Sequence, residues 1–270
     1  MKKSGWQLCK GGPEAFEKYV APAFGGVWAQ DIVKRAALRN GDRVLDVGCG
    51  TGIVARYAYQ LLGDSVHITG VDVNEIALEK AREISALNAA PIEWKHADVS
   101  TLPFSNDKFD VVLCQQGLQY FPDRSRALKE INRVLVNEGR IVFSVWRPIE
   151  FSPFYFTLHK ALEEYINREA TSILASAYTL SDPIQLKTLF EGARFKNIKI
   201  RIVIKQMRYS PLEEFLFGSL SASPFANDIL ALEGIVREEM FQAIRKSISN
   251  YIDDDGLAAP MECYVVFATK

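Results

Sequence analysis

At 270 residues the chain is long enough for one large α/β domain with additions, over residues 1–270. Its net charge of −1 gives no general attraction to nucleic acid, and a 48% hydrophobic content is ordinary for a globular protein. The absence of a secretory signal and of a membrane-spanning apolar run predicts a cytoplasmic protein with no membrane span.

The four cysteines predict neither disulfides nor a metal site. Cys9, Cys49, Cys114 and Cys263 form no C-x-x-C pair and have no histidine at zinc-binding spacing. The acidic run at 253–255 has no following glutamate at the spacing of a calcium loop. We therefore expect no metal, and we expect Cys49 to fill space in a tight loop.

Two helices are expected within residues 1–40. Pro13–Val20 has a proline in its first turn and stops at Ala21–Pro22. Val27–Leu38 has an apolar side at helical spacing, and Phe24–Gly26 forms a joint between the two helices. The segment is therefore predicted to hinge.

The first strand, Arg43–Val47, leads directly into a glycine turn. Gly48, Gly50 and Gly52 let the chain bend sharply with backbone N–H groups facing outward, and the helix from Ile53 presents its positive end there. We expect a polar or anionic ligand at this turn. A dinucleotide site requires a third glycine at position 53, so the isoleucine makes that match imperfect.

Acidic residues end the next two strands. Val66–Val73 carries Asp72 about twenty residues beyond the turn, where a carboxylate can accept hydrogen bonds from a ribose diol. Asn74 is the better N-cap for the helix that follows. The third strand, Pro91–Asp98, ends on an acid in the same way.

The remaining elements complete a sheet with insertions. They are a strand at Phe109–Gln116, a helix at Arg124–Leu135 with Asp123 as its N-cap, a strand at Arg140–Trp146, and an edge hairpin formed by 195–209 and 261–270. Segments 147–194 and 210–260 are aromatic-rich or helical insertions near the ligand side. They are interpreted either as a lid over an apolar substrate or as helices that bury one face of the sheet.

The motifs between residues 27 and 146 resemble those of class I S-adenosylmethionine-dependent methyltransferases. Asp46, Gly48, Gly50 and Gly52 match the D-x-G-x-G-x-G motif. The later order Leu-Pro-Phe, Phe-Asp-Val-Val and Ala-Leu-Lys-Glu-Ile-Asn-Arg-Val-Leu resembles the small-molecule, type 11 branch, although Val136–Gly139 replaces its usual Lys-Pro-Gly-Gly. The resemblance implies a doubly wound, seven-stranded, mostly parallel Rossmann-like sheet with a reversed C-terminal edge strand.

The resemblance also implies the cofactor S-adenosyl-L-methionine, the product S-adenosyl-L-homocysteine and a set of binding residues. These residues are Asp46, Gly48, Cys49, Gly50, Asp72, Val73, Asp98, Val99, Gln115, Gln116, Trp28 and Gln30. Asp98 would accept from the adenine amino group while the Val99 N–H contacts the ring. Tyr19, Trp28 and Gln30 would line the site from the N-terminal helices, or would pack those helices onto the sheet.

The expected reaction is in-line methyl transfer to an O, N or C atom of a small, fairly apolar metabolite. A dedicated base is optional; His67 and His96 are expected to be structural or exposed, and His159 is a weak catalytic candidate. Cys114–Gly117 lacks the Asn-Pro-Pro-aromatic run that related enzymes use on bases and amides, which argues against nucleic acid and glutamine acceptors. The protein would be a monomer or homodimer. The alternatives are a nicotinamide-dependent oxidoreductase and a non-catalytic adenosylmethionine-binding protein.

Overall fold

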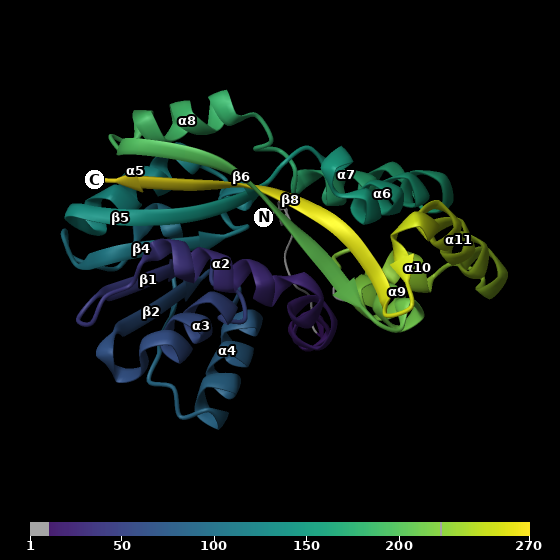
Figure 1. The fold of residues 1–270 in the computed structure, drawn as a ribbon, viewed down its shortest axis with the longest axis horizontal. Helices are drawn as coiled ribbons and strands as arrows, with labels where there is room; N and C mark the ends of the chain where they lie inside the picture. Colours follow the sequence, from purple (N-terminus) through teal and green to yellow (C-terminus); the bar gives the residue numbers. More distant parts are fainter. Residues whose placement is uncertain (1–10, 222) are drawn as a thin grey trace.

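The computed structural model describes residues 11–221 and 223–270, which form one mixed sheet with helices on both faces (Figure 1). The strand order is β3-β2-β1-β4-β5-β8-β6, and the first five of these run parallel. The strands are β1 (Arg43–Val47), β2 (His67–Asp72), β3 (Glu93–His96), β4 (Phe109–Gln115), β5 (Leu135–Trp146), β6 (Lys196–Tyr209), β7 (Ile252–Asp253) and β8 (Gly256–Thr269). The predicted doubly wound α/β class is confirmed.

Alternating side chains bury both faces of the sheet. In β1, Val44 packs beneath α2 (Gly26–Ala36) and α3 (Ile53–Leu62), while Leu45 faces the opposite layer. That second layer consists of α5 (Arg124–Val134) and α8 (Pro183–Gly192), and α4 (Glu75–Leu87) packs beside β3. Because helices cover both faces of the parallel strands, a ligand can bind only at an edge of the sheet. In open α/β sheets that edge is the one formed by the carboxyl ends of the strands, which we call the ligand edge.

The predicted hairpin forms the edge of the sheet, and the reversed strand β8 is the inner of its two strands. β8 runs antiparallel to both β5 and β6, and the two-residue β7 pairs with β8 as an eighth strand. Residues 263–266 of β8 are buried, whereas β6 carries the exposed Lys199 and Arg201. An apolar strand needs neighbours on both sides, and charged residues suit an edge because they discourage further pairing.

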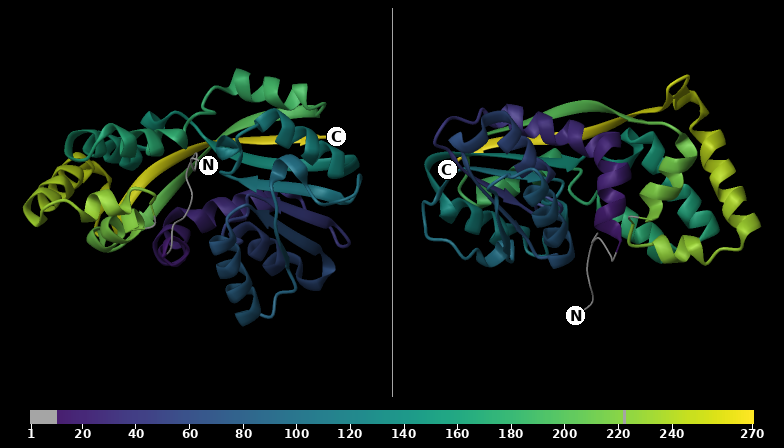
Figure 2. Two further views of the ribbon diagram at one scale, coloured as in Figure 1. Left: turned by 180° about the vertical axis from the view of Figure 1, so that it is seen from behind. Right: turned by 90° about the horizontal axis from the view of Figure 1, so that it is seen from below.

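β6 and β8 continue past the parallel strands (Figure 1), and the chain between them forms three of the inserted helices. These helices gather at one end of the molecule in Figures 1 and 2: α6 (Pro153–Tyr165), α7 (Arg168–Ser176), α9 (Leu212–Ser221), α10 (Ala226–Leu230) and α11 (Gly234–Ser247). α8 is different, because it packs on the sheet with Leu186 and Phe190 in the core. The segment 147–194 therefore divides into a sheet-covering part and a part beside the ligand edge.

The N-terminal helices are continuous, so the predicted stop and joint are wrong. α1 (Gly12–Ala15) runs into the π-helix η1 (Phe16–Gly25), which contains Pro22, and then into α2. A Cβ on Gly26 would lie 3.0 Å from the Tyr57 hydroxyl of α3. Glycine therefore allows close helix packing at this point, and that packing overrides the local break signal.

The predicted N-caps of two helices are present, and short 3₁₀ turns connect the other elements. Asn74 accepts from the Ala77 N–H at the start of α4, and Asp123 accepts from the Arg126 N–H at the start of α5, as predicted. The 3₁₀ turns are η2 (Gly63–Ser65), η3 (Val99–Thr101), η4 (Leu118–Tyr120), η5 (Ile149–Phe151) and η6 (Ser249–Tyr251). Within the described residues every helix is too short or too polar to cross a bilayer, and no His, Cys, Asp and Glu cluster suits a metal ion. Cys9 lies outside these residues.

Candidate cofactor and acceptor site

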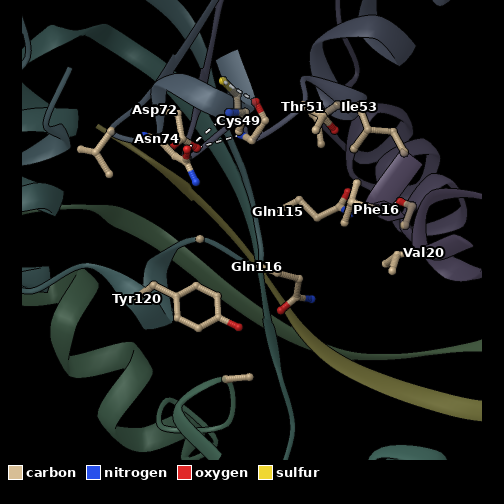
Figure 3. A pocket seen from close by; sticks show the side chains of 18 of the residues that line it. Phe16, Val20, Cys49, Thr51, Ile53, Asp72, Asn74, Gln115, Gln116 and Tyr120 are labelled. Atoms are coloured by element: carbon tan, nitrogen blue, oxygen red, sulfur yellow. Dashed lines mark hydrogen bonds between the residues drawn. The ribbon is translucent and has the colours of Figure 1, made fainter. Parts of the chain in front are cut away.

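A cavity of about 530 Å³ lies where the carboxyl ends of β1, β2 and β4 meet the N-terminal and inserted helices. Its volume is within the usual range for a small-molecule site. Figure 3 shows its two unlike sides, with Cys49, Asp72 and Asn74 together at one end and Tyr120 with Gln116 at the other. We call these ends the cofactor half and the acceptor half.

The glycine turn is tied to the end of β2 by its own amides. The N–H groups of Gly48 and Cys49 both donate to the Val71 carbonyl, at 2.9 and 3.1 Å, and the Gly50 N–H donates to Asp72 Oδ2 at 2.8 Å. The expectation that these N–H groups face outward is therefore wrong at these three positions. The glycine turn lies against the end of β2 because β1, which leads into the turn, pairs with β2 in the register Val47 to Val71. Local sequence does not reveal that register.

Trp94 explains two of the glycines around the turn. A Cβ on Gly52, or on Gly70 in the middle of β2, would overlap the Trp94 indole ring. Gly70 and Trp94 are register partners in β2 and β3, so the ring lies across the sheet surface against the turn. Because Gly52 and Gly70 have no side chains, the Trp94 indole can pack directly against the backbone of the turn and of β2.

Asp46 supplies the helix cap that Gly52 cannot. Gly52 is the N-cap residue of α3 and has no side chain, and Asp46 Oδ2 accepts from the Ala55 N–H at 3.1 Å instead. The pKa of Asp46 is raised to about 7, mainly because its carboxyl is almost fully buried. The Ala55 hydrogen bond opposes this shift, and the nearby Asp72 contributes to it. Asp46 is therefore an acid that titrates near neutral pH.

Replacing Asp46 with asparagine is expected to change how stability depends on pH. Because the folded-state pKa lies above the unfolded value, the protonated acid favours folding below about pH 4, and this contribution is lost as pH rises through about 7. Between those limits the wild type should lose of order 4 kcal/mol relative to Asp46→Asn, measured by urea unfolding. Parallel pH curves for the two proteins would contradict it.

Asp110→Asn is the control with the opposite sign. The Arg43 guanidinium lowers the pKa of Asp110, with the bond between Arg43 Nε and Asp110 Oδ2 at 2.8 Å. Asp110 therefore stabilises the fold at neutral pH and loses that contribution as the pH falls through its folded-state pKa. Relative to Asp110→Asn, the wild type should lose stability on acidification.

Two further acids lie at the strand ends of the cofactor half. Asp72 accepts from the N–H groups of Gly50 and Asn74, both at 2.8 Å, and burial raises its pKa despite those bonds. Asp98 accepts from the Ser100 N–H at 2.7 Å, and its side chain is exposed. Both carboxylates line the cavity on neighbouring strands, as the sequence predicts.

The π-helix η1 is held over the glycine turn by polar contacts. Glu17 pairs with Arg56 of α3 at 2.8 Å and accepts from the Thr51 hydroxyl. On its other side, Gln115 Nε2 at the end of β4 donates to the Gly25 carbonyl at 3.1 Å. Because both contacts come from the cofactor half, η1 closes that half of the cavity.

The two glutamines after β4 differ in what they offer to a ligand. Gln115 lines the cavity with its Oε1 buried and without a hydrogen-bond partner. Gln116 is already occupied, because its Nε2 contacts Cys263 Sγ at 2.9 Å and its Oε1 accepts from Gln119 at 3.3 Å. Gln115 is therefore the one of the pair with an acceptor atom to spare.

The acceptor half is aromatic and uncharged. Tyr120 comes from η4, Tyr155 from α6 and Tyr178 from just beyond α7. In Figure 3, Phe16 and Val20 of η1 lie on the side of Thr51 and Ile53, across the cavity from Tyr120. The other apolar or small side chains that line the cavity outside the glycine turn include Phe24, Phe121, Trp146, Leu158, Leu174, Ala177, Ser219, Leu220, Ser223 and Phe225. Among the described lining residues, the charged ones are the three aspartates of the cofactor half.

The structure brings ten of the twelve predicted binding residues to the cavity and leaves two away from it. Trp28 is fully buried against Trp146, with ring centroids 5.9 Å apart, and Gln30 is exposed on α2. Neither lines the cavity, because α2 packs its apolar face on the sheet; Trp28 thus has the packing role that the sequence left open as an alternative. Tyr19 also packs elsewhere, against Tyr209.

His159 does not line the cavity either, so its weak candidacy for catalysis is not supported. Its neighbours on α6, Tyr155 and Leu158, point to the cavity in its place. His67 and His96 are exposed as expected, and His96 Nε2 lies 2.9 Å from the Val73 carbonyl. Cys49 is buried in the turn, which raises the pKa of its thiol and agrees with a space-filling role.

Sequence reasoning missed the apolar residues that η1 contributes. Phe16, Val20 and Phe24 recur every four residues and line the cavity together. The periodic signal was present, but a helix stop at Pro22 divides it. Tyr155 and Tyr178 were predicted only as parts of an aromatic insertion, because no local pattern tells which residues of a lid face inward.

Comparison with known proteins agrees with this geometry. The methyltransferase domain family matches residues 45–143. A demethylmenaquinone methyltransferase of Staphylococcus aureus is 31% identical over 190 residues, which cover 65% of this chain and 76% of the relative.

Solved structures share the fold at lower identity. The YcgJ protein of Bacillus subtilis superposes with a TM-score of 0.60 at 16% identity, covering 90% of this chain and 97% of the other. Phosphoethanolamine N-methyltransferase 2 of Haemonchus contortus, solved with S-adenosyl-L-methionine, gives 0.57 at 20% identity, covering 90% and 52%. The fold, the acids at the strand ends and the Staphylococcus relative together lead to one assignment: this chain belongs to the S-adenosylmethionine-dependent methyltransferases.

Proposed function

We propose that the protein transfers a methyl group to a small, fairly apolar metabolite bound in the acceptor half. The observation that carries the proposal is the division of one cavity into an end with three carboxylates and an end that is aromatic and uncharged. A cytoplasmic location and a monomeric or homodimeric state belong to the same proposal.

The cofactor half suits the three parts of S-adenosylmethionine. Asp72 would bind the ribose hydroxyls. Each of its carboxylate oxygens accepts one backbone N–H, from Gly50 or Asn74, and can accept a second hydrogen bond. Asp98 and the Val99 N–H would bind the adenine. The unpartnered Gln115 Oε1 fits the ammonium of the amino-acid end, because that group is a donor that a buried acceptor lacks.

The cofactor supplies a methyl group on a positively charged sulfur, and S-adenosylhomocysteine leaves once a lone pair of the acceptor has formed the new bond to carbon. The chain's contribution is to align the acceptor and exclude water. η1, which Glu17 and the Gly25 carbonyl hold in place, would exclude water from the cofactor half. The described residues that line the cavity include no histidine, and the proposed displacement uses no base from the acceptor half.

Methyl-deuterated S-adenosylmethionine tests this function. The protein is incubated with organic-solvent and aqueous extracts of bacterial cells, and the labelled products are identified by mass spectrometry. The label is expected in small apolar compounds of the organic extract. Transfer to RNA, to protein or to water-soluble anions, or no transfer in any fraction by a protein that binds S-adenosylhomocysteine, would contradict the proposal.

A further inference from the structure

The polar groups of the acceptor half are few, and most of them are already in use. Gln116 is bound to Cys263 and Gln119, and the Ser223 hydroxyl donates to the Leu220 carbonyl at 2.5 Å. The tyrosine hydroxyls are the polar set that comes from several elements at once, and among them Tyr120 interacts with Gln119 and Tyr178 with Ser152. In Figure 3 the Tyr120 hydroxyl points into the space beside Gln116 and away from Asp72.

The three tyrosines are neutral hydrogen-bond donors. Burial raises the pKa of Tyr120, of Tyr155 and of Tyr178, and the electrostatic effect of the neighbouring tyrosines raises the pKa of Tyr155 and Tyr178 further. A phenolate beside a methyl group on positive sulfur would itself compete as a nucleophile. Keeping the phenols protonated avoids this, and it leaves each O–H able to donate to a ligand oxygen.

The surroundings exclude charged ligands from this half of the cavity. Phosphate or carboxylate would be buried without a lysine, arginine or histidine, which the described lining lacks. An ammonium group would be buried without a carboxylate and next to the positive sulfur of the cofactor. An uncharged molecule avoids both costs, and an oxygen atom on it can accept hydrogen bonds from the phenol O–H groups.

We propose that Tyr120, Tyr155 and Tyr178 form a hydroxyl cluster that binds an oxygen atom of an uncharged acceptor. This inference rests on the proposed function and narrows it. The acceptor carries a hydroxyl or carbonyl on an apolar body, and phosphate esters, carboxylates and aliphatic amines are not acceptors. The apolar body lies against Phe24, Leu158 and their neighbours.

Calorimetry with four probes of one shape tests the cluster. The protein saturated with S-adenosylhomocysteine is titrated with 4-butylphenol, butylbenzene, 4-butylbenzoate and 4-butylbenzylamine. The phenol is expected to bind about tenfold or more tightly than the anion and the cation, because neither charge has a partner. Equal affinity for a charged probe, or no binding of the phenol, overturns the proposal.

Single Tyr→Phe variants locate the oxygen site. Tyr120→Phe, Tyr155→Phe and Tyr178→Phe should each weaken phenol binding about fivefold while leaving butylbenzene binding unchanged, since only a hydroxyl is removed. Tyr59→Phe is the control, because the Tyr59 hydroxyl bonds to Asp64 at 3.0 Å on the exposed surface. Unchanged phenol affinity in any two of the cavity variants overturns the shared role.

The cofactor titration keeps this test separate from the proposed function. Each variant is first titrated with S-adenosylhomocysteine alone, and its affinity should equal that of the wild type because the tyrosines lie in the acceptor half. Loss of cofactor binding by the wild type would refute the proposed function. Retained cofactor binding with no preference for the phenol refutes the tyrosine cluster alone.

Discussion

Replacing Asp72 with alanine is expected to weaken S-adenosylhomocysteine binding about 100-fold, or ~2.7 kcal/mol. The carboxylate is proposed to accept from the ribose hydroxyls, and hydrogen bonds to a charged group are the stronger ones. It also accepts from the amides of Gly50 and Asn74, so its removal leaves the glycine turn less firmly held. Both effects act in the same direction, and calorimetry measures their sum.

Glu75→Ala is the matched control for charge and location. Glu75 lies three residues along the chain in α4, and its exposed carboxylate pairs with Arg82 at 2.6 Å. Removing it should leave cofactor affinity within about twofold of the wild type, because exposed ion pairs contribute little. Asp72→Asn should fall between wild type and alanine, since an amide oxygen can still accept from one amide. Equal affinities of Asp72→Ala and Glu75→Ala would contradict the ribose assignment.

The cofactor half could be predicted from sequence because its parts are local. Short apolar or alternating runs bounded by turn residues predict the strands, and these strands place Asp46, Asp72 and Asp98 at or near their carboxyl ends. Parallel strands then bring those ends to one edge. The partners of the turn amides could not be predicted in this way, because they depend on the register of β1 against β2.

The acceptor half depends on contacts between segments far apart in the chain. Tyr155 and Tyr178 reach the cavity because α6 and α7 lie beside the helices carried by β6 and β8. Likewise, the sequence predicted Trp28 as a lining residue and Phe24 as part of a joint. Packing on the sheet instead buries Trp28 in the core and leaves Phe24 in the cavity lining. Periodicity identifies an apolar face without naming what covers it.

Gly52→Ala is expected to lower the free energy of unfolding by about 3–4 kcal/mol, a large part of the stability of an ordinary domain. Its Cβ would overlap the Trp94 indole, and its φ of +83° is one that alanine adopts only with strain. Gly70→Ala meets the same ring without a positive φ, so about 2 kcal/mol is expected. Gly192→Ala, where a Cβ meets nothing within 4 Å, should change stability by less than about 0.5 kcal/mol.

Shortening Trp94 separates the two causes of that loss. In a Trp94→Leu background the ring is gone, so Gly70→Ala should cost almost nothing, while Gly52→Ala should still cost about 1 kcal/mol from its backbone conformation. Urea unfolding of the single and double variants measures both couplings. If the costs of Gly70→Ala and Trp94→Leu simply add, the indole does not restrict the glycine. If the two costs are instead not additive, the Trp94 side chain of β3 restricts the backbone next to the glycine turn. The cofactor half then depends on Trp94, because the Gly50 N–H donates to Asp72 only while the turn keeps its position.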